Sequence, residues 1–156
     1  TGYDLATYLW PAQYSGKNGV DLQKLWARDS PRAYMGMQVP DFPNFFMLYG
    51  PNSQPVSGGI SLPSWFQIWS GYIARCLSMM IEGGHTQVSV TEAAFKDFNQ
   101  RLDAEAAGLA FIQDKGSVEQ NYYVNEEGRL QVNTPLETAD LYAVSKAPRR
   151  EDLEFS

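Results

Sequence analysis

The sequence predicts an α/β fold in which a buried strand leads through a loop into one long helix. Residues 45–49 form a continuous apolar run, which is typical of a strand buried on both faces of a parallel sheet. Residues 50–59 are rich in glycine and proline, as expected of a loop. Apolar residues then recur every three or four positions as far as Met80, which indicates a helix with one buried face.

The first part of the chain predicts short elements. Proline, glycine and asparagine interrupt residues 1–32 every few positions, so mainly loops are expected there. Within this stretch, residues 21–28 place three apolar side chains at the spacing of one helix face and predict about two helical turns. Residues 34–37 predict a short strand.

The long helix has recognisable ends. Ser61 is suited to the position just before a helix, and Pro63 is acceptable in the first turn. Gly83 and Gly84 end the periodic pattern, so the helix would be about 30 Å long. Its apolar face carries Cys76, which is expected to be a buried small side chain rather than a nucleophile.

A membrane span is an alternative for this helix, because Arg75 is the only charged residue between positions 60 and 81. Serine, glutamine, glycine and proline dilute the apolar run, and no basic cluster flanks it. A helix packed against a sheet is therefore favoured, with Trp65 and Trp69 expected in the core.

Further short elements follow the long helix. Residues 87–90 predict a strand, and Thr91 is suited to cap a helix that runs to about Gly108. The turn residues 125–128 separate two apolar stretches and predict a hairpin. One last helix is expected near residues 136–144, and the charged run 150–154 is expected to be a solvated tail.

Composition excludes several classes of protein. The net charge is −6, and all of it falls in residues 91–156, so binding to nucleic acid is disfavoured. One cysteine and one histidine cannot form a zinc cage, so no metal site is expected. The single cysteine favours a reducing compartment, and with no signal sequence expected at Thr1 the predicted location is the cytoplasm.

The strand, loop and long helix together form the best candidate for a site. In α/β folds a ligand lies beyond the carboxyl end of a strand, and the N-terminus of the next helix carries partial positive charge. Gly58 and Gly59 would let a flat or anionic ligand approach the backbone. The loop lacks the ending of a nucleoside-triphosphate loop, and no Gly-x-Ser-x-Gly motif supports a hydrolase that uses His85. A turn that binds nothing remains the alternative.

The segment RAYMGMQVPDFPNFFMLYGPN, residues 32–52, resembles the flavin-dependent class B monooxygenases. The similarity is greatest to Baeyer–Villiger monooxygenases of the 4-hydroxyacetophenone monooxygenase type. Weaker similarities to the same family's motifs occur in residues 1–3, 9–26, 123–129 and 132–135, so that the resemblance covers nearly the whole chain.

The resemblance implies the C-terminal part of a longer flavoprotein with two Rossmann-like dinucleotide-binding domains. Residues 1–90 would be the C-terminal part of the FAD-binding domain, and residues 91–156 a C-terminal extension of helices and a hairpin. The enzyme would use FAD, NADPH and molecular oxygen to form a C4a-peroxyflavin that inserts oxygen into a ketone or oxygenates a heteroatom. Its partner would be the missing N-terminal part of the same chain. No catalytic residue is assigned, because the family's catalytic arginine would lie upstream.

The resemblance also implies roles for individual residues around the loop. The cofactor-binding residues would be Thr1, Gly2, Pro51, Asn52, Gly58, Gly59 and Ile60. The substrate-binding residues would be Gln54, Val56 and Ser57. The alternative hypothesis is a non-catalytic interaction module that docks a partner through the Trp-rich helix at residues 61–81.

Overall fold

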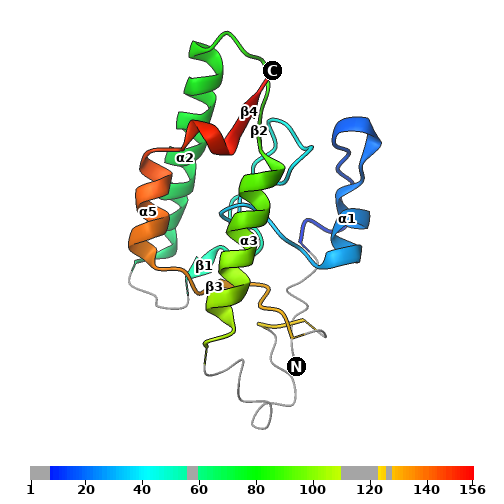
Figure 1. The fold of residues 1–156 in the computed structure, drawn as a ribbon, viewed down its shortest axis with the longest axis vertical. Coiled ribbons are helices and arrows are strands. Elements are labelled where there is room, and N and C mark those ends of the chain that lie inside the picture. Colours follow the sequence, from blue (N-terminus) through cyan, green and yellow to red (C-terminus); the bar gives the residue numbers. More distant parts are fainter. Residues whose placement is uncertain (1–7, 56–59, 110–122, 126–127) are drawn as a thin grey trace.

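The computed structural model describes residues 8–55, 60–109, 123–125 and 128–156 (Figure 1). Its helices are η1 (Lys17–Gly19), α1 (Leu22–Asp29), α2 (Leu62–Glu82), α3 (Glu92–Ala106), α5 (Thr138–Lys146) and η2 (Arg150–Asp152). Its strands are β1 (Gln54–Pro55), β2 (Val88–Val90), β3 (Asn133–Thr134) and β4 (Leu153–Phe155). The predicted mixture of helix and strand is confirmed.

The helices form the bulk of the described structure. In Figure 1, α2 and α5 lie side by side, α3 crosses the centre, and α1 lies on the far side of α3. Two small sheets lie near opposite ends of α2 (Figure 1). In one, β1 pairs in parallel with β3, and in the other, β2 pairs antiparallel with β4. Each sheet therefore joins an early segment of the chain to a late one.

Helix α2 has the core face that its periodicity predicts. Its buried side chains are Trp65, Trp69, Tyr72 and Cys76, which recur at three- and four-residue spacing. The two indole rings stack with their centroids 5.8 Å apart. Among the described residues, no helix is both long and apolar enough to cross a membrane.

Two other helices begin at a capping side chain, and for α3 this is the predicted Thr91. The Asp21 carboxylate accepts a hydrogen bond from the Lys24 amide at the start of α1, and Thr91 Oγ1 accepts one from the Ala94 amide at the start of α3. These caps satisfy amides that a helix leaves free in its first turn. Helix α5 and strand β2 also lie close to their predicted positions.

The predicted buried strand at residues 45–49 is wrong. This segment is irregular, and Asn44 and Tyr49 have φ angles of 59° and 63°. The chain therefore turns at both ends of this short segment, and among the described residues no strand pairs with it. The segment is also not buried on both faces as predicted, since Met47 is buried while Leu48 is 48% exposed.

The predicted strand at residues 34–37 is also wrong, because these residues form a tight turn. Tyr34 and Gln38 are bridged, and Met35 and Gly36 between them have φ angles of 51° and 70°. A Cβ on Gly36 would lie 2.5 Å from the Cβ of Ser53. Glycine therefore allows this turn to pack directly against the loop before β1.

The charged run 150–154 is not a solvated tail. Asp152 and Leu153 are buried, and β4 pairs with β2 in the register Val90 to Leu153. The alternation of apolar and polar side chains along β4 places Leu153 inward and Glu154 outward. One hydrophobic core contains residues from both sides of position 90, including Tyr34, Trp69, Leu136 and Leu153.

Candidate functional site

The candidate site is the ligand loop, which we define as residues 49–61, together with the start of α2. Its described parts are residues 49–55 and 60–61. Within the loop, Tyr49 donates its hydroxyl hydrogen to Gln54 Oε1 at 2.5 Å, and Ser53 Oγ donates to the Gly50 carbonyl at 2.7 Å. Burial raises the pKa of the Tyr49 hydroxyl, which therefore stays protonated and can donate.

Asn52 attaches the ligand loop to the later part of the chain. Its side chain is buried, and its backbone has a φ angle of 53°, which asparagine tolerates better than most residues. Its Nδ2 donates to the carbonyls of Leu130 and Asn133 at 2.8 and 3.0 Å, and its amide donates to the Gln131 carbonyl at 2.8 Å. The polar atoms of this side chain thus serve to hold the loop.

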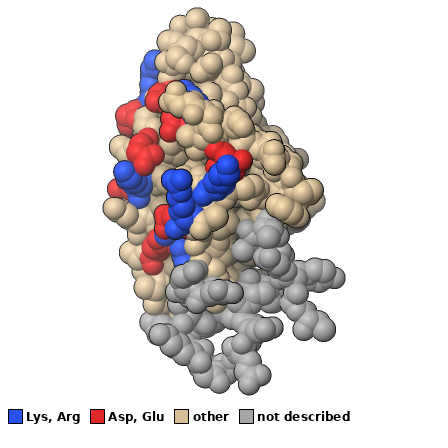
Figure 2. Space-filling view, turned by 90° about the vertical axis from the view of Figure 1, so that its right-hand side faces the viewer, with Lys and Arg blue, Asp and Glu red and all other residues tan. Residues whose placement is uncertain are grey.

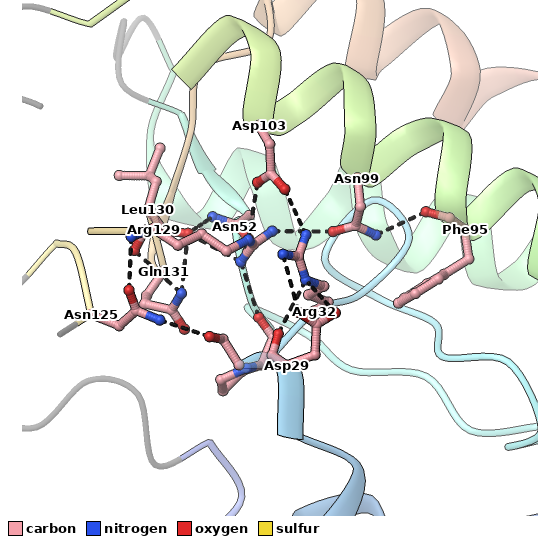
Figure 3. A network of polar contacts seen from close by, with 12 residues as sticks. Asp29, Arg32, Asn52, Phe95, Asn99, Asp103, Asn125, Arg129, Leu130 and Gln131 are labelled. Carbon is pink, nitrogen blue, oxygen red and sulfur yellow. Dashed lines mark hydrogen bonds and ion pairs between the residues drawn. The ribbon is translucent and has the colours of Figure 1, made fainter. Parts of the chain in front are cut away.

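Arg129 completes the polar environment of Asn52 (Figure 3). Its Nη1 donates to Asn52 Oδ1 at 3.1 Å, and its Nη2 donates to Asn99 Oδ1 at 3.2 Å. Its Nε forms an ion pair with the Asp103 carboxylate at 2.9 Å. The Arg129 side chain is only 10% exposed, and this burial lowers its pKa while Asp103 raises it. An arginine nevertheless remains charged, so the site contains a buried cation.

Arg32 and Asp29 extend this polar network to the end of α1. Arg32 Nη1 contacts the Asp103 carboxylate at 2.7 Å, and its Nε contacts Asp29 at 3.0 Å. Asp103 therefore lies between two guanidinium groups, as Figure 3 shows. The network links α1, the ligand loop, α3 and the segment around Arg129.

The N-terminus of α2 differs from those of the two capped helices. Its N-cap residue Ser61 makes no side-chain hydrogen bond to the first-turn amides, and no acidic residue lies in the first turn. The side chains around this end are exposed and apolar, with Ile60 at 40%, Leu62 at 45% and Phe66 at 38%. The first-turn amides are therefore not capped by Ser61, and no acidic side chain of the first turn opposes the partial positive charge at this end.

Two surface grooves lie on either side of the site. A groove of about 780 Å³ between α1 and α3 is lined by Trp26, Arg32, Asn99 and Asp103 among others, so it borders the polar network. A second groove, of about 830 Å³, separates α2 from α5. Figure 2 shows basic and acidic side chains interspersed on one face of the molecule, and such a mixture of signs does not favour a polyanion.

The structure describes four of the ten predicted site residues. Thr1, Gly2, Val56, Ser57, Gly58 and Gly59 lie outside the described residues. Pro51 and Asn52 are buried, Gln54 is half-buried and Ile60 is exposed, and all four belong to the ligand loop. Their proposed contacts with cofactor and substrate stay predictions.

Arg129 and its partner Asp103 were not predicted from the sequence. The turn that carries Arg129 was predicted, and Val124 and Leu130 do form a bridge beside it. The pairing with Asp103 has no sequence signal, because an ion pair between distant elements has no fixed spacing. The expected burial of Cys76 is confirmed. Among the described residues, no group of three or more metal-ligating side chains lies together.

The sequence is similar to curated monooxygenases over almost its full length. It is 29% identical over 154 residues to the uncharacterized monooxygenase y4iD of Sinorhizobium fredii, a match of 97% of this chain and 22% of the relative. It is 29% identical over 156 residues to the FAD-binding monooxygenase stcW of Emericella nidulans, covering 100% of this chain and 25% of the relative. No protein-family model matches the chain.

The fold is similar to that of solved monooxygenases. Cyclohexanone monooxygenase from Rhodococcus sp. Phi1, bound to NADP+, superposes with a TM-score of 0.73 at 20% identity, over 92% of this chain and 27% of that one. Steroid monooxygenase bound to NADP gives a TM-score of 0.74 at 18% identity, over 92% and 26%. The chain thus spans about a quarter of the length of the proteins it matches. The predicted resemblance to flavin-containing monooxygenases is confirmed.

Proposed function

We infer that this chain is the C-terminal segment of an FAD- and NADPH-dependent monooxygenase of the Baeyer–Villiger group. The observation that carries the inference is the similarity of nearly the whole chain to about a quarter of several monooxygenases, in sequence and in fold. Residues 1–90 would then complete the FAD-binding domain, and residues 91–156 would form a C-terminal extension. The shared core across position 90 implies that the two parts fold together.

The described residues fit one edge of a flavin site. When bound, the reduced flavin supplies the electrons that activate molecular oxygen, and it carries negative charge. The uncapped N-terminus of α2 would stabilise that charge through its free amides, since no acidic side chain in the first turn opposes it. Pro51, Asn52, Gly58, Gly59 and Ile60 would present the loop to the ring, and Thr1 and Gly2 would also contact the cofactor.

The rest of the site would come from the remainder of the polypeptide. Neither Gly-x-Gly-x-x-Gly fingerprint of a dinucleotide-binding domain occurs in these 156 residues. We therefore expect the 156-residue chain, purified alone, to show no flavin absorbance and no NADPH oxidation. Stoichiometric FAD bound to the isolated chain would contradict a shared site.

The proposed reaction consumes a ketone, molecular oxygen and NADPH with a proton, and yields an ester, NADP+ and water. Oxygenation of a sulfide or amine is the second candidate within the same class. Exposed apolar side chains in the ligand loop and next to it favour an apolar substrate or a covering domain; they are Leu48, Ile60, Leu62 and Phe66. Gln54, Val56 and Ser57 would line the substrate pocket. A cytoplasmic enzyme agrees with a single buried cysteine.

The experiment uses the full-length gene product that contains this segment. Its reading frame should encode two glycine-rich fingerprints before Thr1, and the purified protein should bind FAD. NADPH consumption with a panel of cyclic ketones and sulfides, under ¹⁸O₂, should give one labelled oxygen atom in the product. Absence of both fingerprints, or FAD-loaded protein with no labelled product from any substrate class, would contradict the proposal.

A further inference from the structure

Arg129 is a buried cation for which the flavin proposal has no role. Its guanidinium donates toward three carbonyl or amide oxygens through Nη1 alone: Asn52 Oδ1 at 3.1 Å, the Leu130 carbonyl at 3.2 Å and the Pro31 carbonyl at 3.3 Å. Such a planar donor group is suited to fix several acceptors at once, and a lysine at the same position could not do so.

The other face of the Arg129 guanidinium is fixed to the helical part of the molecule. Asp103 and Asn99 both belong to α3, one turn apart, and contact Nε and Nη2. Asp103 is itself held by Arg32 at 2.7 Å. The two cations and two anions of this network balance, so that the buried charge of Arg129 is compensated. Its orientation is therefore fixed by two side chains of α3 in addition to the acceptors of Nη1.

Asn52 connects this fixed group to the ligand loop. Its Oδ1 accepts from Arg129, and its Nδ2 donates to the carbonyls of the next residue, Leu130, and of Asn133. Two residues further on, Gln54 pairs with Asn133 as β1 meets β3. Asn52 thus lies two residues before β1 (Gln54–Pro55), which is itself part of the ligand loop.

We propose that Arg129 is a positioning residue for the flavin site, which acts through Asn52 to hold residues 50–55 of the ligand loop in place. The inference rests on the proposed function, because the loop is assigned there to the flavin. It assigns a task to Arg129 that is separate from catalysis, because this side chain contacts Asn52, Asn99 and Asp103 and would affect the cofactor only through the loop.

The test compares Arg129→Lys with Arg101→Lys in the full-length holoenzyme. Arg101 is a matched control, since it also extends from α3 and pairs with an acid, Asp140, but on the exposed surface. Loss of one charge-assisted hydrogen bond changes an equilibrium constant about tenfold. Arg129→Lys should therefore raise the dissociation constant for FAD about tenfold. It should also speed hydrogen–deuterium exchange of the amides of Asn52 and Gln54 about tenfold in the apoprotein, with Arg101→Lys unchanged.

A double-mutant cycle separates positioning from general stability. If Arg129 acts through Asn52, the double variant with Asn52→Ala should bind FAD no more weakly than the weaker single variant. Additive losses, or unchanged FAD binding and loop exchange despite a lower melting temperature, would overturn the inference. Should Arg129→Lys fail to fold, Asp103→Asn gives the same comparison with a milder change, and it is expected to show the same pattern.

The same measurements distinguish failure of the inference from failure of the proposed function. Wild-type protein that binds no FAD would contradict the proposed function and the flavin part of this inference. Loop exchange in the apoprotein would then still decide whether Arg129 holds the ligand loop. FAD binding in the wild type with equal binding in Arg129→Lys would overturn the inference alone.

Discussion

The early and late halves of the chain meet at two places, each made of a short strand pair and a buried charged side chain. The terminal clasp consists of β2, β4 and the contact of Asp152 with Tyr34, and the loop brace consists of β1, β3 and the contact of Arg129 with Asn52. Pairs of two- or three-residue strands have little stability of their own. In each place a buried charged side chain reinforces the pair.

The difference lies in what the charged side chain holds. Asp152 accepts from Tyr34 Oη at 2.7 Å and from Arg149 Nε at 2.8 Å, and Tyr34 belongs to the main hydrophobic core. Arg129 instead holds a loop that lies beside the free end of α2. The clasp should therefore contribute to the stability of the whole fold, whereas the brace should act mainly on the loop. Each prediction below tests this division.

Asp152→Ala should have the largest effect. It leaves the buried Tyr34 hydroxyl without its acceptor and removes the partner of Arg149, which should lower the free energy of unfolding by about 3 kcal/mol. Urea denaturation followed by tryptophan fluorescence measures this, with the neighbouring exposed residue in Glu151→Ala as the control. A loss below about 1 kcal/mol would mean that the clasp does not stabilise the core.

Gly36→Ala should lower the free energy of unfolding by about 2 kcal/mol, because the turn at Gly36 packs against the loop that the brace holds. The new Cβ would lie 2.5 Å from the Cβ of Ser53, at a φ angle of 70° that alanine disfavours. Gly19→Ala is the matched control, since its φ angle is 73° but nothing lies within 4 Å of the added Cβ. The control should cost about 1 kcal/mol. The loss of unfolding free energy in Gly36→Ala minus that in Gly19→Ala shows how tightly the turn at Gly36 packs on the loop. Equal losses in the two variants would show no such packing.

The parts that were predicted from sequence are those with local signals. Helix α2 follows from its apolar period and its flanking glycines, and α3 follows from Thr91. The strand at 45–49 failed because its composition is that of a strand, whereas Asn44 and Tyr49 adopt positive φ angles under tertiary packing.

Both meeting points of the two halves were missed for a related reason. The charges of the 150–154 run indicated solvent, but β4 pairs with β2, more than sixty positions earlier. Likewise, the ligand loop was recognised from its glycines and from family resemblance, while the group that holds it, Arg129, lies 77 residues from Asn52. Pairing between distant segments leaves no periodic trace in either one.

Cys76→Ala should change how the free energy of unfolding depends on pH, and it should not affect the ligand loop. Burial raises the pKa of the Cys76 thiol to about 11, against 9.0 for a free thiol. The unfolded chain therefore ionises first, so this contribution is fully present below pH 9 and is lost as the pH rises toward 11. Between pH 8 and pH 10 the wild type should therefore lose about 1 kcal/mol more of its free energy of unfolding than Cys76→Ala does. Urea denaturation at pH 8 and pH 10 measures this loss in both proteins. Equal losses in the wild type and in Cys76→Ala would contradict a buried thiol.

Arg101→Ala should have the smallest effect, because its ion pair with Asp140 joins α3 to α5 at the surface. The two side chains are 55% and 59% exposed, in contrast to the 10% exposure of Arg129. Solvent screening limits such a pair to about 0.3 kcal/mol, and 1 M salt should remove even that. Thermal unfolding at low and high salt checks both points. A loss above about 1 kcal/mol that persists in salt would mean that charge pairs stabilise this fold wherever they join two segments. Burial would then not set the Asp152 and Arg129 contacts apart from charge pairs at the surface.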